Sequence, residues 1–268
     1  MISPLANIHP DAKIGNNVTI DPFSVIQDKV SIGDNTHVMS NAFIGSGTTI
    51  GTGCTIFPGA VIGTIPQDLK FVGEETTVIV GNNTTIRECV TIHRGTKDKW
   101  KTVVGSDCLL MAYAHVAHDC ILGNHVILAN GVQLAGHVTV DDYAILGGLA
   151  GAHQFTHIGA HTYVAGHTVI RKDVPPFVKA AREPLSFMGV NIVGLQRCGY
   201  TKEAIAEISA IYHILFVEKN TTSLAISQIE ERFADSKYRE AILQFIKNSK
   251  TGIIKRQSKI SPDDDFAI

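Results

Sequence analysis

The chain has 268 residues, and its 23 Lys and Arg nearly balance 25 Asp and Glu, which leaves a net charge of −2. This balance argues against a nucleic-acid-binding protein, and the lack of an apolar run of about eighteen residues argues against a membrane span. No basic-then-apolar leader follows Met1, so we expect a cytoplasmic protein. Five cysteines without CxxC spacing fit a reducing compartment, with Cys54, Cys108 and Cys120 as packing thiols.

From Ile8 to Ile170 an aliphatic residue returns at six-residue spacing in one unbroken phase. A strand has a period of about 2 and a helix one of about 3.6, so this period fits neither alone. It predicts the hexapeptide repeats of a parallel β-helix, in which three hexads close a triangular coil and each aliphatic side chain points inward. The register consists of Ile8, Ile14, Ile20, Ile26, Ile32, Val38, Ile44, Ile50, Ile56, Ile62, Val80, Ile86, Ile92, Val104, Leu110, Val116, Leu122, Leu128, Leu134, Val140, Leu146, Ala152, Ile158, Val164 and Ile170.

The register is interrupted twice, at roughly residues 68–79 and 97–103, and resumes each time in the same phase. We expect two loops pushed out from a corner of the coils, because loops on a rigid scaffold often carry binding residues. The first loop begins with Gln67-Asp68-Leu69-Lys70, and the second contains Trp100, the only tryptophan of the chain.

A second region is expected after Ile170. Pro175 and Pro176 are predicted to end strand-like pairing, and a helical period begins near Thr201. We predict two domains, a β-helical catalytic domain at residues 1–186 and a small α-helical domain at residues 187–268. The second should contain three amphipathic helices whose apolar stripes form its core. These stripes are Ile205, Ile208, Tyr212 and Leu215, then Leu224, Ile229 and Phe233, then Tyr238, Ile242, Phe245 and Ile246.

Histidine is enriched in one part of the predicted β-helix, since eight of the twelve lie between His115 and His167. With eighteen residues per coil, residues eighteen apart should lie one above the other at about 4.8 Å. This places His118, Gly136 and Gln154 in one column, and Asp119, His137 and Phe155 in the adjacent column. An imidazole base beside a glycine N–H that can stabilise an oxyanion suits acyl transfer, with Asp119 orienting an imidazole. Solvated surface histidines are the alternative interpretation of the same spacing.

No nucleophile motif accompanies this base. The sequence has no GxSxG, and Cys120 occupies a corner position where packing requires a small residue. We therefore expect direct attack by a hydroxyl or amine of one substrate on an activated acyl group of the other, with His118 removing the proton.

Several motifs, in this order along the chain, closely resemble the bacterial UDP-N-acetylglucosamine O-acyltransferases, which begin lipid A synthesis. The resemblance covers essentially the whole chain, and the hexads alone are shared with many other acyltransferases. The fold it implies is mainly β, a left-handed parallel β-helix of hexapeptide repeats followed by a small α-helical C-terminal domain. The motifs are Gln67-Asp68-Leu69-Lys70, Val90-Thr91-Ile92-His93-Arg94-Gly95-Thr96, Ala114-His115-Val116-Ala117-His118-Asp119-Cys120, Leu134-Ala135-Gly136-His137, His153-Gln154-Phe155 and Gly189-Val190-Asn191-Ile192.

The resemblance implies transfer of an (R)-3-hydroxyacyl group from acyl carrier protein to the 3-hydroxyl of UDP-N-acetylglucosamine. It implies a homotrimer with sites between subunits, and no cofactor or metal. By matching position, His118 is the general base, Asp119 its partner and the Gly136 N–H the oxyanion donor. Sugar or phosphopantetheine contacts fall on Gln67, Asp68, Lys70, His115, His137, His153 and Gln154.

The resemblance also assigns residues to the nucleotide and to the acyl chain. Asn191 and Arg197 match positions that bind the nucleotide and its phosphates, but this chain has Val193 and Cys198 where well-known members carry a glutamate and a second arginine. The residue that closes the acyl groove matches Gly166. A glycine leaves the groove open, so we expect a long acyl chain of about fourteen carbons or more, since each methylene admitted is worth about 1–3 kcal/mol.

Basic residues after the last hexad are candidates for docking the acidic carrier protein, with ordinary solvated surface as the alternative. These residues are Arg171, Lys172, Lys179 and Arg182.

Three other functions are compatible with a hexapeptide β-helix. A UDP-glucosamine N-acyltransferase usually has an additional N-terminal uridine-binding domain, whereas the repeat begins here at Ile8. A zinc-dependent hydratase of the β-helical carbonic anhydrase type would hold a metal with three histidines from two subunits, and it fits the QDLK motif and the C-terminal helices poorly. A scaffold without catalysis would leave the His118 column unexplained.

Overall fold

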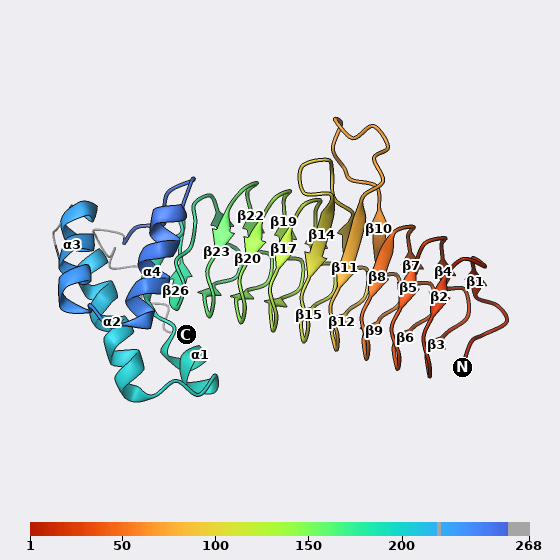
Figure 1. The fold of residues 1–268 in the computed structure, drawn as a ribbon, viewed down its shortest axis with the longest axis horizontal. Coiled ribbons are helices and arrows are strands. Elements are labelled where there is room, and N and C mark those ends of the chain that lie inside the picture. The colour runs from red at the N-terminus through yellow and green to blue at the C-terminus, as the bar shows by residue number, and fades with distance from the viewer. Residues whose placement is uncertain (219–220, 257–268) are drawn as a thin grey trace.

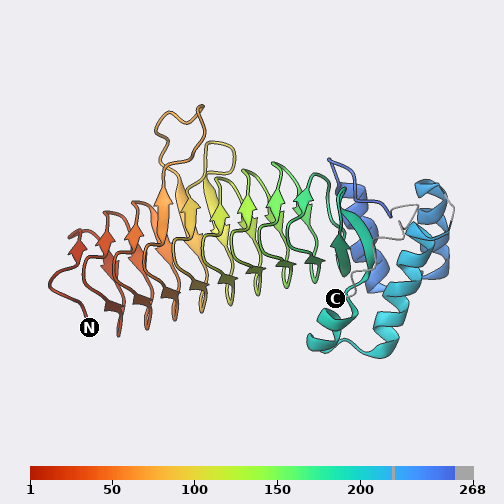
Figure 2. The ribbon, with the colours of Figure 1, turned by 180° about the vertical axis from the view of Figure 1, so that it is seen from behind.

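A computed structural model describes residues 1–218 and 221–256 of the chain (Figure 1). Short strands form an elongated stack of coils that begins at the N-terminus, and helices cover the far end (Figures 1 and 2). This is a left-handed parallel β-helix with a C-terminal helical region, so the predicted fold class is confirmed.

Three sheets form the three faces of the coils, and each coil contributes one strand to each sheet. The first sheet contains β1 (Asn7–Ile8), β4 (Val25–Ile26), β7 (Phe43–Ile44), β10 (Val61–Thr64), β13 (Thr91–His93), β16 (His115–Val116), β19 (Gln133–Leu134), β22 (Gly151–Ala152) and β25 (Val169–Ile170). The second contains β2 (Lys13–Ile14), β5 (Ser31–Ile32), β8 (Thr48–Ile50), β11 (Thr77–Val80), β14 (Lys101–Val104), β17 (Ile121–Leu122), β20 (Thr139–Val140) and β23 (His157–Ile158). The third contains β3 (Thr19–Ile20), β6 (His37–Val38), β9 (Thr55–Ile56), β12 (Thr85–Ile86), β15 (Leu109–Leu110), β18 (Ile127–Leu128), β21 (Ile145–Leu146), β24 (Tyr163–Val164), β26 (Val178–Ala181) and β27 (Ser186–Val190).

The interior of the coils is a stack of the aliphatic residues that define the register. Residues eighteen apart pair across neighbouring strands, as in Leu128 with Leu146, and Ile44, Ile56 and Ile62 are completely buried. Isoleucine and valine suit these strands because their branched side chains are stiff and pack well on a pleated surface. Burying each such side chain stabilises the fold by about 1.5–3 kcal/mol.

The corners between the sheets need two kinds of residue. A small residue turns inward, and its polar atom often bonds to the next coil, as when Cys54 Sγ donates to the Gly81 carbonyl at 3.1 Å. The residue in the left-handed backbone region is often Asn, Asp or His, which tolerate that region better than most, and at Asp119 φ is 61°. Cys108 and Cys120 are free and buried, and burial raises their pKa to about 11 and about 12. Thiols in this state are poor nucleophiles.

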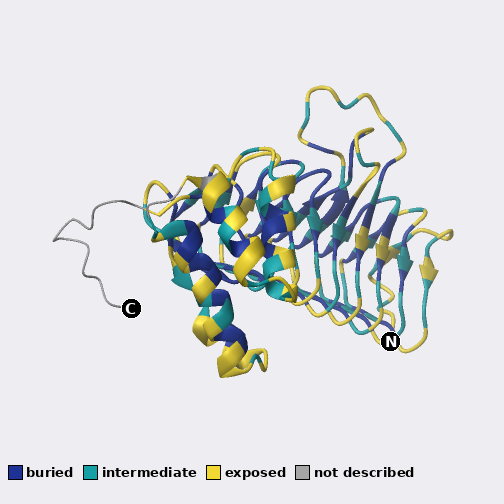
Figure 3. Ribbon diagram, turned by 60° about the vertical axis from the view of Figure 1, so that its left-hand side comes forward, coloured by how far each residue is buried: buried dark blue, intermediate teal, exposed yellow. Residues whose placement is uncertain are grey.

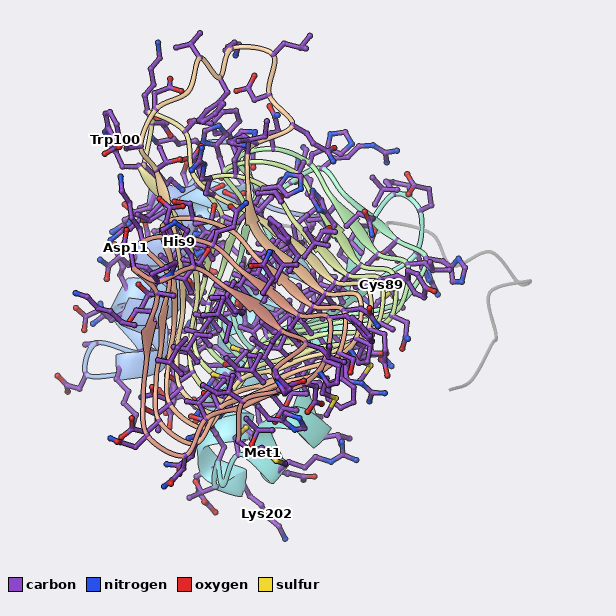
Figure 4. All side chains as sticks on the ribbon, turned by 90° about the vertical axis from the view of Figure 1, so that its right-hand side faces the viewer. Met1, His9, Asp11, Cys89, Trp100 and Lys202 are labelled. Carbon is purple, nitrogen blue, oxygen red and sulfur yellow. The ribbon has the colours of Figure 1, made fainter. Side chains whose placement is uncertain are left out.

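Two loops interrupt the coils and project from the same edge, the corner between the first and second sheets (Figures 1 and 2). They span residues 65–76 and 94–100, so each begins three residues earlier than the register indicates. Strands β11 and β14 also begin earlier, because they pair over four residues from Thr77 with Lys101 to Val80 with Val104. Much of the first loop is exposed (Figure 3). Seen along the stack, the labelled Trp100 lies with the loops and Cys89 at another corner (Figure 4).

The C-terminal region differs from the prediction in three details. Sheet pairing continues beyond Pro176, because β26 pairs with β24 and then with β27 in an antiparallel hairpin that runs to Val190. The three amphipathic helices are α2 (Lys202–Phe216), α3 (Thr222–Arg232) and α4 (Lys237–Asn248), preceded by the short unpredicted helix α1 (Ile192–Arg197). Leu224 was expected in the core and is 49% exposed. Among the described residues, no helix is both long and apolar enough to cross a membrane.

Candidate active site

His118 and Asp119 form a buried pair at the corner that carries the two loops. His118 Nδ1 lies 2.9 Å from Asp119 Oδ2, and their exposed fractions are 6% and 0%. The left-handed backbone at Asp119 turns its carboxylate back toward the preceding imidazole. With Nδ1–H donating to this carboxylate, Nε2 carries the lone pair that a general base needs.

The loop at residues 94–100 supplies the remaining partners of the Asp119 carboxylate. Thr96 Oγ1 donates to Oδ2 at 2.6 Å, the Thr96 N–H donates to Oδ1 at 3.0 Å, and the Lys99 N–H donates to Oδ1 at 3.1 Å. Burial raises the pKa of this carboxyl, but the hydrogen bonds from Thr96 and His118 outweigh burial, and the net effect lowers the pKa. Asp119 is therefore held as an anion.

Gly136 lies against the ring of His118, as the eighteen-residue stacking predicts. A Cβ atom at Gly136 would come within 2.5 Å of His118 Cε1 and 2.6 Å of Nε2, so only glycine leaves room for the imidazole. Within the described part of the chain, the Gly136 N–H donates to no backbone or side-chain acceptor. This free donor lies beside the His118 ring, and a backbone N–H of this kind can stabilise an oxyanion.

His137 forms the second wall of this cluster. Its ring meets His118 edge-on with centroids 5.0 Å apart and stacks on Phe155 at 4.4 Å, so the adjacent column is also present. His137 Nδ1 lies 3.0 Å from Asp98 Oδ2, within ion-pair distance, but the two do not meet the geometry of a hydrogen bond.

Two further histidines lie beside the pair on the first sheet. His115 Nδ1 lies 2.7 Å from Thr91 Oγ1, and its ring meets His93 edge-on at 4.9 Å. Burial, followed by the neighbouring His115 and His118, lowers the pKa of His93 to about 4, and burial and His118 also lower the pKa of His115. Both rings are therefore neutral near pH 7.

His118, Asp119 and His137 offer ligand atoms within 4.8 Å of one another, close enough to surround a metal ion. Both carboxylate oxygens of Asp119, however, already accept hydrogen bonds from Thr96, Lys99 or His118. A metal would have to displace those bonds, so the donor set fits an acid–base pair better than a metal centre.

The other predicted site residues lie at various places on the prism. His153 and Gln154 are exposed on the next coil of the same corner, and Gln67, Asp68 and Lys70 lie on the projecting loop, where Asp68 Oδ1 accepts from the Lys70 N–H.

Gly166 lines a groove at the corner between the third and first sheets. The groove has a volume of about 590 Å³, and Tyr113, Leu149 and His167 also line it. It is well placed for an apolar chain, but it is separated from His118 by the width of the first sheet.

Asn191 and Arg197 lie at the third corner. Asn191 caps α1 by accepting from the Gly194 N–H, and its Nδ2 donates to the His161 carbonyl at 2.9 Å. Arg197, Val193 and Cys198 are exposed on or beside this helix. In one chain, the three groups of predicted site residues therefore occupy three different corners.

The chain is similar to known proteins over most of its length. The bacterial transferase hexapeptide family matches residues 29–64 and 101–136, and the family of UDP-N-acetylglucosamine O-acyltransferase domain 2 matches residues 173–254. The acyl-[acyl-carrier-protein]–UDP-N-acetylglucosamine O-acyltransferase of Aliivibrio fischeri is 44% identical over 262 residues, which cover 95% of this chain and 100% of that protein. The chain belongs to this O-acyltransferase family.

Other relatives are similar over the same extent. The enzyme of the same name from Pseudomonas savastanoi is 41% identical over 95% of this chain and 99% of its own. The crystal structure of a UDP-N-acetylglucosamine acyltransferase from Bacteroides fragilis superimposes with a TM-score of 0.94 at 49% identity, covering 95% of this chain and 100% of that one. The Francisella novicida enzyme gives a TM-score of 0.93 at 38% identity, covering 96% and 95%. These matches favour neither the N-acyltransferase nor the hydratase.

The contribution of the second loop was not predicted from the sequence. Thr96, Asp98 and Lys99 all face the His118 cluster, yet only Thr96 belongs to a motif that we quoted, and we assigned it no role. The position of the interruption could have indicated this contribution, because the loop lies at the same corner as Asp119, one coil earlier.

Proposed function

We propose that this protein transfers an (R)-3-hydroxyacyl group from acyl carrier protein to the 3-hydroxyl of UDP-N-acetylglucosamine, with His118 as the general base. The observation that carries the assignment of the base is the buried His118–Asp119 pair beside the unpaired Gly136 N–H. The family supports the substrates, and this reaction is the first step of lipid A biosynthesis.

The proposed reaction uses these three groups. His118 Nε2 takes the proton of the sugar 3-hydroxyl as its oxygen attacks the thioester carbonyl, and the C–O bond forms. The Gly136 N–H donates to the resulting oxyanion, while Asp119 stabilises the imidazolium through Nδ1. The C–S bond then breaks, the carbonyl re-forms, and the leaving thiolate receives the proton from His118.

A covalent enzyme intermediate is not needed. Cys120 is the thiol nearest in sequence to the base, but it donates to the Ala135 carbonyl at 3.1 Å and its pKa is raised to about 12 by burial. A thiol in this state cannot compete with an activated sugar hydroxyl.

The groove lined by Gly166 is proposed to hold the acyl chain. It carries few polar groups, and Tyr113 and Leu149 expose 67% and 58% of their surface there, which an acyl chain or a neighbouring subunit can cover. With no side chain at Gly166, a long chain of about fourteen carbons or more can extend through the groove.

A homotrimer brings the three corners together. The base, the acyl groove and the candidate nucleotide residues Asn191 and Arg197 are on different corners of one chain, so a complete site needs corners from neighbouring copies. A prism with three flat faces assembles readily around a threefold axis. The proposal includes contacts with the sugar or the phosphopantetheine arm from Gln67, Asp68, Lys70, His115, His137, His153 and Gln154. We also infer that the protein acts in the cytoplasm.

Carrier protein is proposed to dock near the end of the β-helix. Of the four predicted basic residues, Arg171 and Lys172 line a cavity of about 410 Å³ there, together with Lys255 and Arg256, whereas Lys179 and Arg182 do not line it. Arg171 also pairs with Glu183. Such a cluster attracts an acidic partner, and the reaction rate at limiting carrier protein should fall with added salt.

A donor and acceptor panel tests the proposal. Purified protein is incubated with UDP-N-acetylglucosamine and a series of 3-hydroxyacyl carrier proteins, and product is measured by mass spectrometry. A product heavier by one acyl group, sensitive to mild base as an ester should be, is expected. An amide product formed only from an acylated UDP-glucosamine would instead identify an N-acyltransferase, and no transfer from any donor would refute the proposal.

A further inference from the structure

The Asp119 carboxylate accepts more hydrogen bonds than its pairing with His118 alone requires. Oδ2 accepts from Thr96 Oγ1 at 2.6 Å and from His118 Nδ1 at 2.9 Å, while Oδ1 accepts from the Thr96 and Lys99 N–H groups. Three of these four bonds come from the loop at residues 94–100, which no repeat of the β-helix requires. Thr96 makes two of them, and it is 7% exposed.

A competing partner lies close to the same carboxylate oxygen. His137 Nδ1 is 3.9 Å from Asp119 Oδ2, and although it lies 3.0 Å from Asp98 Oδ2, it makes no hydrogen bond of good geometry among the described residues. A modest rotation of the carboxylate would bring Oδ2 to His137 and release His118 Nδ1. His118 could then carry its proton on Nε2, which is the wrong tautomer for a base.

We propose that Thr96 is a positioning residue of the acyl transfer, whose hydroxyl fixes the Asp119 carboxylate toward His118 and away from His137. This inference rests on the proposed function of His118. Thr96 acts through Asp119 and touches no reacting atom. The bond from Thr96 Oγ1 is the shortest to this carboxylate and lies on the oxygen that His118 uses, so its loss affects the orientation of the base directly.

Other charged and titratable groups face His118 and Asp119 and contribute to the pH dependence of the reaction. Asp98 lies against His137, Lys99 Nζ donates to the Asp119 carbonyl at 3.1 Å, and His93 and His115 act electrostatically on the cluster. None of them donates a side-chain hydrogen bond to the Asp119 carboxylate within the described residues. The Thr96 hydroxyl is therefore the side-chain bond to change.

The test compares Thr96→Val, which keeps the shape and the backbone N–H but removes the hydroxyl, with Thr96→Ser, which keeps the hydroxyl. We expect kcat to fall about tenfold or more in the valine variant, because small misplacements of a base are costly, with the KM for UDP-N-acetylglucosamine little changed. The acidic limb of the kcat/KM profile should move to lower pH, because a base that has lost its carboxylate partner is harder to protonate. Serine should restore both quantities.

Thr84→Val is the matched control, since Thr84 is also a buried corner threonine whose hydroxyl donates to a carbonyl, that of Gly105, away from the pair. It should lose stability without moving the pH profile. A ¹⁵N spectrum of the histidines supplies a second readout, in which His118 should be protonated on Nδ1 in the parent and mixed in Thr96→Val. Parent-like kcat, pH profile and tautomer in Thr96→Val would overturn the inference. An inactive parent would refute the proposed function instead, and the spectrum would still decide the role of Thr96.

Discussion

At the scale of single residues, the site depends on what can occupy adjacent corner positions in successive coils. His118 needs a carboxylate beside it and open space next to it, and the coil supplies both through Asp119 and Gly136. The glycine has no side chain because the imidazole occupies that space. The same absence leaves its N–H accessible to a ligand.

Replacing Gly136 by alanine should therefore reduce both activity and stability. The added Cβ would overlap the imidazole, with His118 Nε2 only 2.6 Å away, so the base must move. We expect kcat to fall about tenfold or more and the free energy of unfolding to fall by about 1–3 kcal/mol, measured by steady-state kinetics and chemical denaturation. Gly151→Ala is the control, because its nearest contact would be 4.0 Å away. Parent-like kcat in Gly136→Ala would contradict the placement of the imidazole.

His93 should make stability depend on pH. Its pKa in the folded protein is about 4, below the ordinary value of 6.5, because burial disfavours the charged ring. Between these two values the unfolded chain binds the proton and the folded chain does not, so stability falls by up to about 3 kcal/mol as pH drops from 6.5 to 4. In His93→Gln most of this loss should be absent, so the free energy of unfolding, measured at pH 7, 5.5 and 4.5, should depend less steeply on pH. An unchanged slope would show that His93 is not the group responsible.

At the scale of secondary-structure elements, the contacts that could be predicted are those that follow from the eighteen-residue period of the coils. Stacking at eighteen residues placed His118 beside Gly136 and His137 beside Phe155, because a rigid coil converts sequence distance into position. The loop at residues 94–100 has no such period. Its bonds from Thr96 and Lys99 to Asp119 depend on how the loop folds back, and sequence spacing does not determine that.

The C-terminal region shows the same difference. The apolar stripes of α2 and α4 were predictable, because Ile208 and Ile242 repeat with the helical period and are buried. Helix α1 is too short for a period, and only its capping residue Asn191 marks its start. Strand β26 was missed because prolines precede it, although the chain returns to the sheet directly after them.

The acyl groove can be tested at Gly166. A methionine there should project into the groove and shift the preferred donor to a shorter chain, measured with a series of acyl carrier proteins. Any side chain at Gly166 also meets the backbone, since its Cβ would lie 2.8 Å from the Gly148 carbonyl oxygen. Gly166→Ala therefore carries the same strain with little blockage. The groove would not set the acyl-chain length if the alanine and methionine variants preferred donors of the same length. The same would follow if the methionine variant preferred the same donor as the parent.

At the scale of the whole molecule, the proposed function requires more than one copy of the chain. The corners that carry His118, Gly166 and Asn191 are separated by the faces of the prism, so one chain cannot bring all three to one substrate. Light scattering of the purified protein should give three times the mass of a single chain, at concentrations where the enzyme is active. A fully active monomer would contradict a site shared between subunits.

The most direct test of the account is the rate of acyl transfer to UDP-N-acetylglucosamine in the parent and in His118→Ala. A parent that forms the acylated sugar nucleotide, with a variant that remains folded and is slower by about a hundredfold or more, is the predicted result. A folded His118→Ala protein that transfers the acyl group at the parent's rate would contradict the assignment of His118 as the base.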